Sequence, residues 1–315
     1  VVSGTPLKDI VPLVLHDRED PTSMATEIPF EFLEELGLLK QDLLVVDGLS
    51  IIDQTISLIR ERHDPTFELL PEKEETYDDP VALSIFAKGD LAGIWQMSSH
   101  GMRELCVSLQ PSGLNDIAAV CALYRPGPLD FIDHETGFNM VETYVRRKRG
   151  LLPVHYDHEK VKDALSTTYG VIVFQEQIMQ IARSLCGWSY AQADYLRKAV
   201  GKKLPEEIEK QKLKFIPAAK EHSGLDDTLV NRIWDQIEVF GRYGFNSAHS
   251  YAYGKLSYQM AYIKGRYPVE FLAAAINSAC DKGDKAKRIG LLHDFVDEAL
   301  RKGIKVKAPD ICNSK

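Results

Sequence analysis

The sequence predicts a mainly helical protein with a small α/β part at its N-terminus. Up to about Asp47 the chain carries short β-prone runs, such as Leu13–Leu15, separated by Gly and Pro. From Ser50 onward, apolar residues recur at helical spacing, first at Ile51, Ile52, Thr55, Ile56 and Ile59. The chain has 315 residues, of which 44% are hydrophobic. This is enough for a buried core and corresponds to about two domains. We expect a first domain over residues 1–47 and a second over residues 48–315.

Composition limits the classes of function. The net charge is −8, so any site for a polyanion must be local. The five Cys residues stand far apart without a Cys-x-x-Cys pair, which is typical of reduced thiols in a cytoplasmic protein. No apolar run is long enough to span a membrane, and there is no signal peptide. The chain opens at Val1 without Met, as a piece of a longer polypeptide would.

One acidic residue interrupts an apolar run in the first domain. Asp42 lies within Leu38–Val46, which has the pattern of a buried strand. A carboxylate there costs free energy unless it is paired, hydrogen-bonded or bound to a cation. Lys40 is two residues away and would share its face of the strand. Such a pair can hold a metal ion and a phosphate, whereas the structural alternative is a bend residue that caps a backbone amide.

Two basic features lie in the first half of the helical region. A predicted helix at 115–123 stops at the rigid sequence Tyr124-Arg125-Pro126-Gly127-Pro128. Arg125 on this corner could contact a phosphate, or the corner could simply stiffen a loop. Four consecutive cations follow, and they cannot share one helix face, so some must reach solvent or a polyanion. They are Arg146, Arg147, Lys148 and Arg149.

A β-branched run and two helices form the next region. The run from Tyr169 leads into an amphipathic helix that we expect to end at Gly187. Ser189 can cap the next helix, and Gly201 can end it in the left-handed conformation. Four cations lie within seven residues at the end of this second helix and just past it. By themselves they are compatible with a solvated helix end that complements the macrodipole. The four are Arg197, Lys198, Lys202 and Lys203.

A further helix should begin at Asn246 or Ser247 and run to about Arg266. His249, near its start, is a candidate hydrogen-bond donor to a polar ligand, or alternatively an interior imidazole. Tyrosines also recur along the helix at spacings of seven and four. This stripe is more typical of a core than of a base-stacking platform. Its members are Tyr251, Tyr258 and Tyr262.

Several of these stretches occur in the order typical of one family. They are Leu123–Pro128, Tyr169–Ala182, Ala193–Lys203, Tyr243–Asn246 with His249–Ser250, and Ser257–Gln259 with Tyr267–Pro268. Together they resemble the alpha subunits of bacterial DNA polymerase III, the C family of DNA polymerases. The resemblance implies that residues 1–47 are the end of a polymerase-beta-like palm. It implies that residues 48–315 belong to a large helical fingers region.

The resemblance also implies an activity and its residues. The activity is DNA-directed DNA synthesis, in which two Mg²⁺ ions are held by three Asp residues of the palm. Asp42, with Lys40 before it, matches the third Asp, and Asp47 is the fallback. No Asp-x-Asp pair occurs in the 315 residues. The other metal ligands would therefore lie outside this chain, and the isolated chain should not polymerise.

The remaining roles follow from the same resemblance. Arg197 and Lys198 would bind the triphosphate of the incoming deoxynucleotide, together with Asn246 and His249. Template-primer DNA would be contacted by Arg125, Arg146, Arg147, Lys148, Arg149, Lys202 and Lys203. In the family, the sliding clamp and other replicase subunits are partners, and no membrane is involved. The alternative is a non-catalytic DNA-binding or scaffolding module derived from a polymerase.

Overall fold

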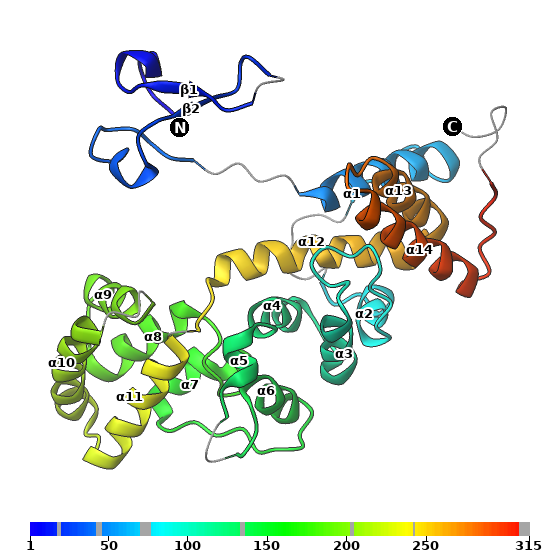
Figure 1. The fold of residues 1–315 in the computed structure, drawn as a ribbon. Helices are drawn as coiled ribbons and strands as arrows, with labels where there is room; N and C mark the ends of the chain where they lie inside the picture. The colour runs from blue at the N-terminus through cyan, green and yellow to red at the C-terminus, as the bar shows by residue number, and fades with distance from the viewer. Residues whose placement is uncertain are drawn as a thin grey trace. The chain divides into compact units, whose positions relative to one another are not determined.

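The chain was analysed as a computed structural model, which describes residues 1–17, 20–41, 46–69, 77–132, 136–201, 205–241 and 243–308. It forms two compact units, Val1–Val46 and Asp47–Lys315. The division falls next to the boundary predicted from the change in sequence character. The described residues are mostly helical (Figure 1), which confirms the predicted fold class. The assignment of the first unit to a palm stays a prediction.

The described residues of the first unit form a two-stranded antiparallel sheet and two short 3₁₀ helices. Strand β1 (Leu13–Leu15) pairs with β2 (Met24–Thr26), and the 3₁₀ helices are η1 (Leu7–Asp9) and η2 (Phe30–Phe32). An isolated bridge joins Val2 to Leu39. The unit's small core consists of Val11, Leu33 and Leu38. Asp42 and the next three residues of its predicted strand lie outside the described residues.

The second unit is built from helices. Its first group is α1 (Asp47–Arg62), α2 (Pro80–Ala87), α3 (His100–Leu109), α4 (Leu114–Leu123), α5 (Pro126–Asp130) and α6 (Met140–Lys148). Its second group is α7 (Glu159–Leu165), η4 (Ser166–Thr168), α8 (Gln175–Cys186), α9 (Tyr190–Gly201), α10 (Pro205–Ser223) and α11 (Asp227–Gly241). Its last group is α12 (Ser247–Arg266), α13 (Pro268–Cys280) and α14 (Lys285–Arg301). No helix among the described residues is long and apolar enough to cross a membrane.

Helix α12 connects the two ends of the second unit (Figure 1). It packs on α2 and α4 along its length, and on α1 and α13 toward its end. Small residues on its buried face allow a close approach to α4. A Cβ added at Gly254 would lie only 3.2 Å from the backbone nitrogen of Ala118. Of the predicted tyrosine stripe on this helix, only Tyr258 is fully buried as the core interpretation requires, whereas Tyr251 and Tyr262 are half-buried.

Helices α7 to α11 share a separate hydrophobic cluster. Aromatic side chains lie at its centre, where Phe215 packs between Trp188 and Trp234. The apolar face of α8 contributes Ile178, Ile181 and Leu185 to the same cluster. Burial of this face fixes which side of α8 and α9 remains available to solvent. The polar residues of both helices are thereby held on a packed support.

The structure tests the helix caps and helix ends that were predicted from the sequence. Ser189 caps α9, because its hydroxyl accepts from the Gln192 amide at 3.4 Å and the Gln192 side chain accepts from the Ser189 amide at 2.9 Å. Gly187 ends α8 with a φ of 66°, as predicted. Gly201 is the last residue of α9, as predicted, but the left-handed conformation predicted for it was wrong, since its φ is not positive. Glycine permits the left-handed conformation without requiring it.

Candidate functional site

A buried glutamine shapes the segment that enters α8. The Gln177 side-chain oxygen accepts from the amides of Val173 and Phe174 at 2.8 and 2.9 Å. Its side-chain nitrogen donates to the Ala164 carbonyl at 3.0 Å and to the Thr168 hydroxyl at 2.7 Å. Every polar group of this buried amide therefore has a partner. The arrangement fixes the turn between the run at 171–174 and the first residues of α8.

This turn pairs with the segment that leads into α12. Phe174 and Phe245 form an isolated parallel bridge. The Phe245 amide donates to the Val173 carbonyl at 3.1 Å, and the Gln175 amide donates to the Phe245 carbonyl at 2.9 Å. The start of α8 and the start of α12 are thus joined by backbone hydrogen bonds.

Arg197 and Lys198 share one carboxylate on α9. Arg197 Nη2 lies 2.7 Å from Asp194 Oδ1, and Lys198 Nζ lies 2.8 Å from Asp194 Oδ2. Arg197 also donates from Nη1 to the side-chain oxygen of Gln175 at 3.2 Å. These bonds with Lys198 and Arg197 lower the pKa of the Asp194 carboxyl. The two cations are therefore held together beside the start of α8.

The predicted residues Asn246 and His249 lie on the other side of the same junction. Asn246 caps α12, since its side-chain oxygen accepts from the His249 amide at 2.8 Å. Its side-chain nitrogen donates to Glu176 Oε1 at 3.0 Å, and the Ser247 amide donates to Glu176 Oε2 at 3.0 Å. The exposed His249 ring packs between Phe245 and Tyr253, at centroid distances of 5.3 and 4.1 Å.

All four residues predicted to bind the nucleotide belong to one network, which we call the junction network. It joins Arg197, Lys198, Asn246 and His249 through Asp194, Gln175 and Glu176. The sequence reasoning missed these last three as site residues. Asp194 could have been found from its spacing of three and four residues to the cations on one helix. No local pattern indicates the partners of Gln175 and Glu176.

The predicted DNA-contacting cations are arranged differently from one another. Arg146 pairs with Glu142 at 2.9 Å and lies over the Phe138 ring, and Arg149 is exposed at the end of α6. Arg147 donates to the Tyr169 carbonyl at 3.3 Å. The Lys148 side chain is only 9% exposed, and its ammonium lies 3.1 Å from Asp116. Arg125 is half-buried near Phe245, and burial lowers the pKa of its guanidinium. Lys202 and Lys203 lie outside the described residues.

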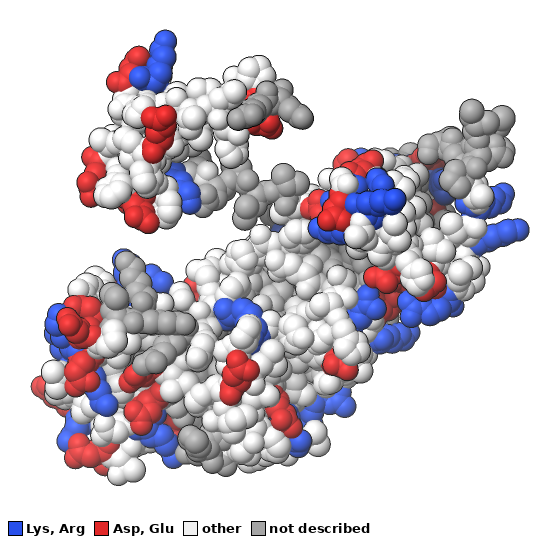
Figure 2. All heavy atoms as spheres, in the orientation of Figure 1, with Lys and Arg blue, Asp and Glu red and all other residues white. Residues whose placement is uncertain are grey.

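Surface charge is mixed rather than uniformly cationic. On the face drawn in Figure 2, Lys and Arg side chains are interspersed with Asp and Glu over the outer helices. The surface over α12 and α4 in this view carries few charged side chains. Attraction of a polyanion to this face therefore depends on small groups of cations.

Comparison with known proteins identifies the family of this chain. The sequence model of the bacterial DNA polymerase III alpha subunit finger domain matches residues 48–223, more than half of the chain. The chain belongs to this family. The predicted resemblance is therefore confirmed, and the junction network residues Gln175, Glu176, Asp194, Arg197 and Lys198 lie within the matched finger domain.

Relatives called DNA polymerase III subunit alpha match this chain over its whole length. Those of Aquifex aeolicus and Bacillus subtilis are 40% and 37% identical over 314 residues, and that of Thermus aquaticus is 37% identical over 321 residues. Each alignment covers 100% of this chain but only 25%, 26% and 24% of the respective relative. The chain thus spans about a quarter of the length of these relatives.

The residues predicted for metal chemistry come before the matched finger domain in the sequence. Lys40 places its ammonium 4.9 Å from the centroid of the Phe30 ring. Asp42 lies outside the described residues. The fallback Asp47 begins α1 and pairs with Lys282 at 2.7 Å. Among the residues whose placement is described, no group of three or more His, Cys, Asp or Glu side chains could hold a metal ion.

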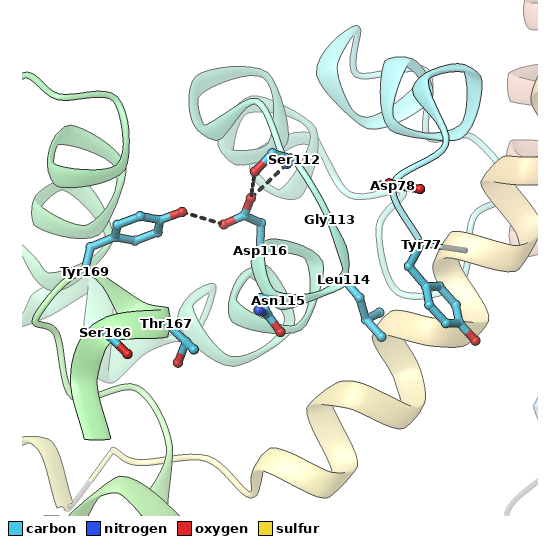
Figure 3. A pocket seen from close by; sticks show the side chains of 10 residues that line it. All are labelled: Tyr77, Asp78, Ser112, Gly113, Leu114, Asn115, Asp116, Ser166, Thr167 and Tyr169. Carbon is cyan, nitrogen blue, oxygen red and sulfur yellow. Dashed lines mark hydrogen bonds between the residues drawn. The ribbon is translucent and has the colours of Figure 1, made fainter. Parts of the chain in front are cut away.

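A separate pocket of about 300 Å³ is lined by Tyr77 and Asp78, by residues 112–116 at the start of α4, and by residues 166, 167 and 169 (Figure 3). Asp116 accepts from the Ser112 amide and hydroxyl, both at 2.8 Å, and from the Tyr169 hydroxyl at 3.4 Å. Burial and the nearby Asp116 carboxylate raise the pKa of Tyr169 to about 12. With Lys148, this carboxylate ties α4, α6 and the entry to α8 together.

Proposed function

We propose that this chain binds the triphosphate of the incoming deoxynucleotide within a replicative DNA polymerase. The observation that most supports this proposal is the shared placement of Arg197 and Lys198. Both are bonded to Asp194 on α9, beside the start of α8. Arg197 is 27% exposed and Lys198 is 57% exposed, so both can meet a ligand from solvent.

The chemistry of these cations suits a triphosphate. A guanidinium can bind two phosphate oxygens at once, while an ammonium acts as a compact point charge. Asp194 keeps both cations oriented before the nucleotide arrives, and Gln175 restricts the Arg197 fork from the other side. Phosphate oxygens then replace the carboxylate oxygens as acceptors. His249 and Asn246, at the start of α12, border the same position and offer hydrogen bonds to the nucleotide.

DNA contacts form the second part of the proposal. Arg146 and Arg149 lie at the end of α6 with access to solvent, and Lys202 and Lys203 follow the cationic helix in sequence. Such cations bind the phosphate backbone without reading sequence, and their contribution falls with salt. We leave Lys148 out of this set because its ammonium is buried against Asp116. The proposed partners are template-primer DNA, the sliding clamp and other replicase subunits, in the bacterial cytoplasm.

The metal-dependent step belongs to the complete polymerase. Asp42 is the proposed Mg²⁺ ligand, with Lys40 beside it to neutralise phosphate charge. When bound, two Mg²⁺ ions supply charge neutralisation at the primer hydroxyl and at the leaving oxygens. Since the 315 residues contain no Asp-x-Asp pair, we propose that the chain by itself does not extend a primer.

The test is Arg197→Ala in the full-length polymerase that contains this chain. We expect the KM for the nucleotide to rise by about tenfold or more, since a charged hydrogen-bond partner is lost. The Kd for primer-template should change much less. Arg301→Ala, an exposed arginine at the end of α14, is the matched control and should leave both constants unchanged. An unchanged nucleotide KM in Arg197→Ala would refute the proposed site.

A further inference from the structure

Arg125 is engaged by the protein on three sides. Its Nε donates to the Ala122 carbonyl at the end of α4 at 2.7 Å, and its Nη2 donates to the Tyr243 carbonyl at 2.7 Å. The guanidinium carbon also lies 4.4 Å from the centroid of the Phe245 ring. These contacts join the rigid corner before α5 to the segment before α12. The Arg125 guanidinium therefore packs against the segment at 243–245 rather than extending into solvent.

Gly127 touches the same segment from the same corner. A Cβ added at Gly127 would lie 1.9 Å from Cδ1 of the Tyr243 ring, a distance that real atoms do not tolerate. Pro126 occupies the first turn of α5, where proline is favoured, and Pro128 is buried. The Pro-Gly-Pro corner therefore presents a fixed surface on which the Tyr243 ring rests directly.

The segment held in this way leads straight into the junction network. Phe245 bonds through its backbone to Val173 and Gln175, and the next residue, Asn246, bonds to Glu176. A shift of Phe245 would move the cap of α12 and the side chain that restrains Arg197. The contacts that the described residues show between this corner and the network run through the segment at 243–245.

We propose that Arg125 and Gly127 are positioning residues for the nucleotide site. They fix residues 243–245 and thereby set Asn246, His249 and Gln175 for the incoming triphosphate. This inference rests on the proposed function of the junction network. It assigns Arg125 a role distinct from the direct DNA contact predicted from sequence, because its Nε and Nη2 donate to backbone carbonyls and one face of the guanidinium packs on Phe245.

The test compares Arg125→Ala, Arg125→Lys and Gly127→Ala in the full-length polymerase. Arg301→Ala and Gly290→Ala are matched controls, since a Cβ at Gly290 in α14 meets nothing within 4 Å. Folding is checked by circular dichroism and thermal unfolding. Nucleotide KM, primer-template Kd and its salt dependence are then measured. Arg125→Lys keeps the charge but not the planar fork, so it serves if Arg125→Ala unfolds.

We expect each corner variant to raise the nucleotide KM by about fivefold or more while the salt dependence of DNA binding is unchanged. Combining Arg125→Ala with Asn246→Ala should add little to the larger single effect, because both act on one segment. A role as a direct phosphate contact instead predicts weaker DNA binding, a salt slope reduced by about one and multiplicative effects on KM. That result would overturn the positioning role.

Arg197→Ala separates this inference from the proposed function. If Arg197→Ala leaves the nucleotide KM unchanged, the nucleotide site itself is misassigned. If Arg197→Ala raises KM but the Arg125 and Gly127 variants do not, the site stands and only the positioning role is overturned.

Discussion

Replacing Gln177 by methionine should destabilise the second unit strongly while preserving the length of the side chain. The substitution removes four hydrogen bonds of 2.7 to 3.0 Å at a position that is only 5% exposed. It leaves the amides of Val173 and Phe174 and the carbonyl of Ala164 without their partner. Each buried polar group that is left without a hydrogen-bond partner costs about 1–3 kcal/mol of stability. Because the surrounding structure relaxes in part, we expect a total loss in unfolding free energy of roughly 3–5 kcal/mol.

The assay is urea unfolding of the chain, followed by circular dichroism and compared with Gln180→Met on the exposed side of the same helix. The Gln180 variant should stay within about 0.5 kcal/mol of the parent, as is usual for surface substitutions. In the full-length polymerase, Gln177→Met should also raise the nucleotide KM, because the turn it supports pairs with Phe245. If Gln177→Met lost no more stability than Gln180→Met, the role of this amide in fixing the turn would be refuted.

Two further predictions concern polar groups that fasten α12 to its neighbours. Lys264 is fully buried and lies 3.0 Å from a Glu298 oxygen. Lys264→Met should therefore cost about 3–5 kcal/mol in unfolding free energy, with part recovered on adding Glu298→Gln. Equal thermal stability of Lys264→Met and the parent would contradict this. Asp79 caps α2 and bonds to Arg266, so Asp79→Ala should cost about 1–2 kcal/mol at pH 7. The Arg266 bond holds the pKa of Asp79 below its ordinary value of 3.8. The stability that Asp79 adds is therefore present above this value and lost as the pH falls through the folded-state pKa. A difference between the variant and the parent that persists well below pH 3.8 would count against it.

Local rules correctly predicted where several helices begin and end. Ser189 and Asn246 act as caps because their side-chain oxygens reach amides within the next three residues. Gly187 ends α8 in the left-handed conformation, and Pro126 prevents α4 from continuing while it begins α5. These interactions span a few residues, so the sequence contains all the information they need.

The four consecutive cations at the end of α6 are a case that sequence neighbours alone do not decide. The sequence indicates that four consecutive cations cannot share one face, but not which of them turn inward. In the structure Lys148 reaches Asp116 and Arg147 reaches the Tyr169 carbonyl, while Arg149 stays exposed. The choice depends on which neighbour packs against α6, and that neighbour comes from elsewhere in the chain.

The sequence alone determined the helical class, the helix ends and, through its ordered motifs, the family. The tertiary structure decided which polar groups meet. Arg125 reaches a carbonyl 118 residues away, Asn246 reaches a carboxylate 70 residues away, and Arg197 reaches Gln175 across 22 residues. Such pairs form only after the apolar faces of the helices have packed and set the distance between their polar sides. No pattern confined to one helix encodes that distance.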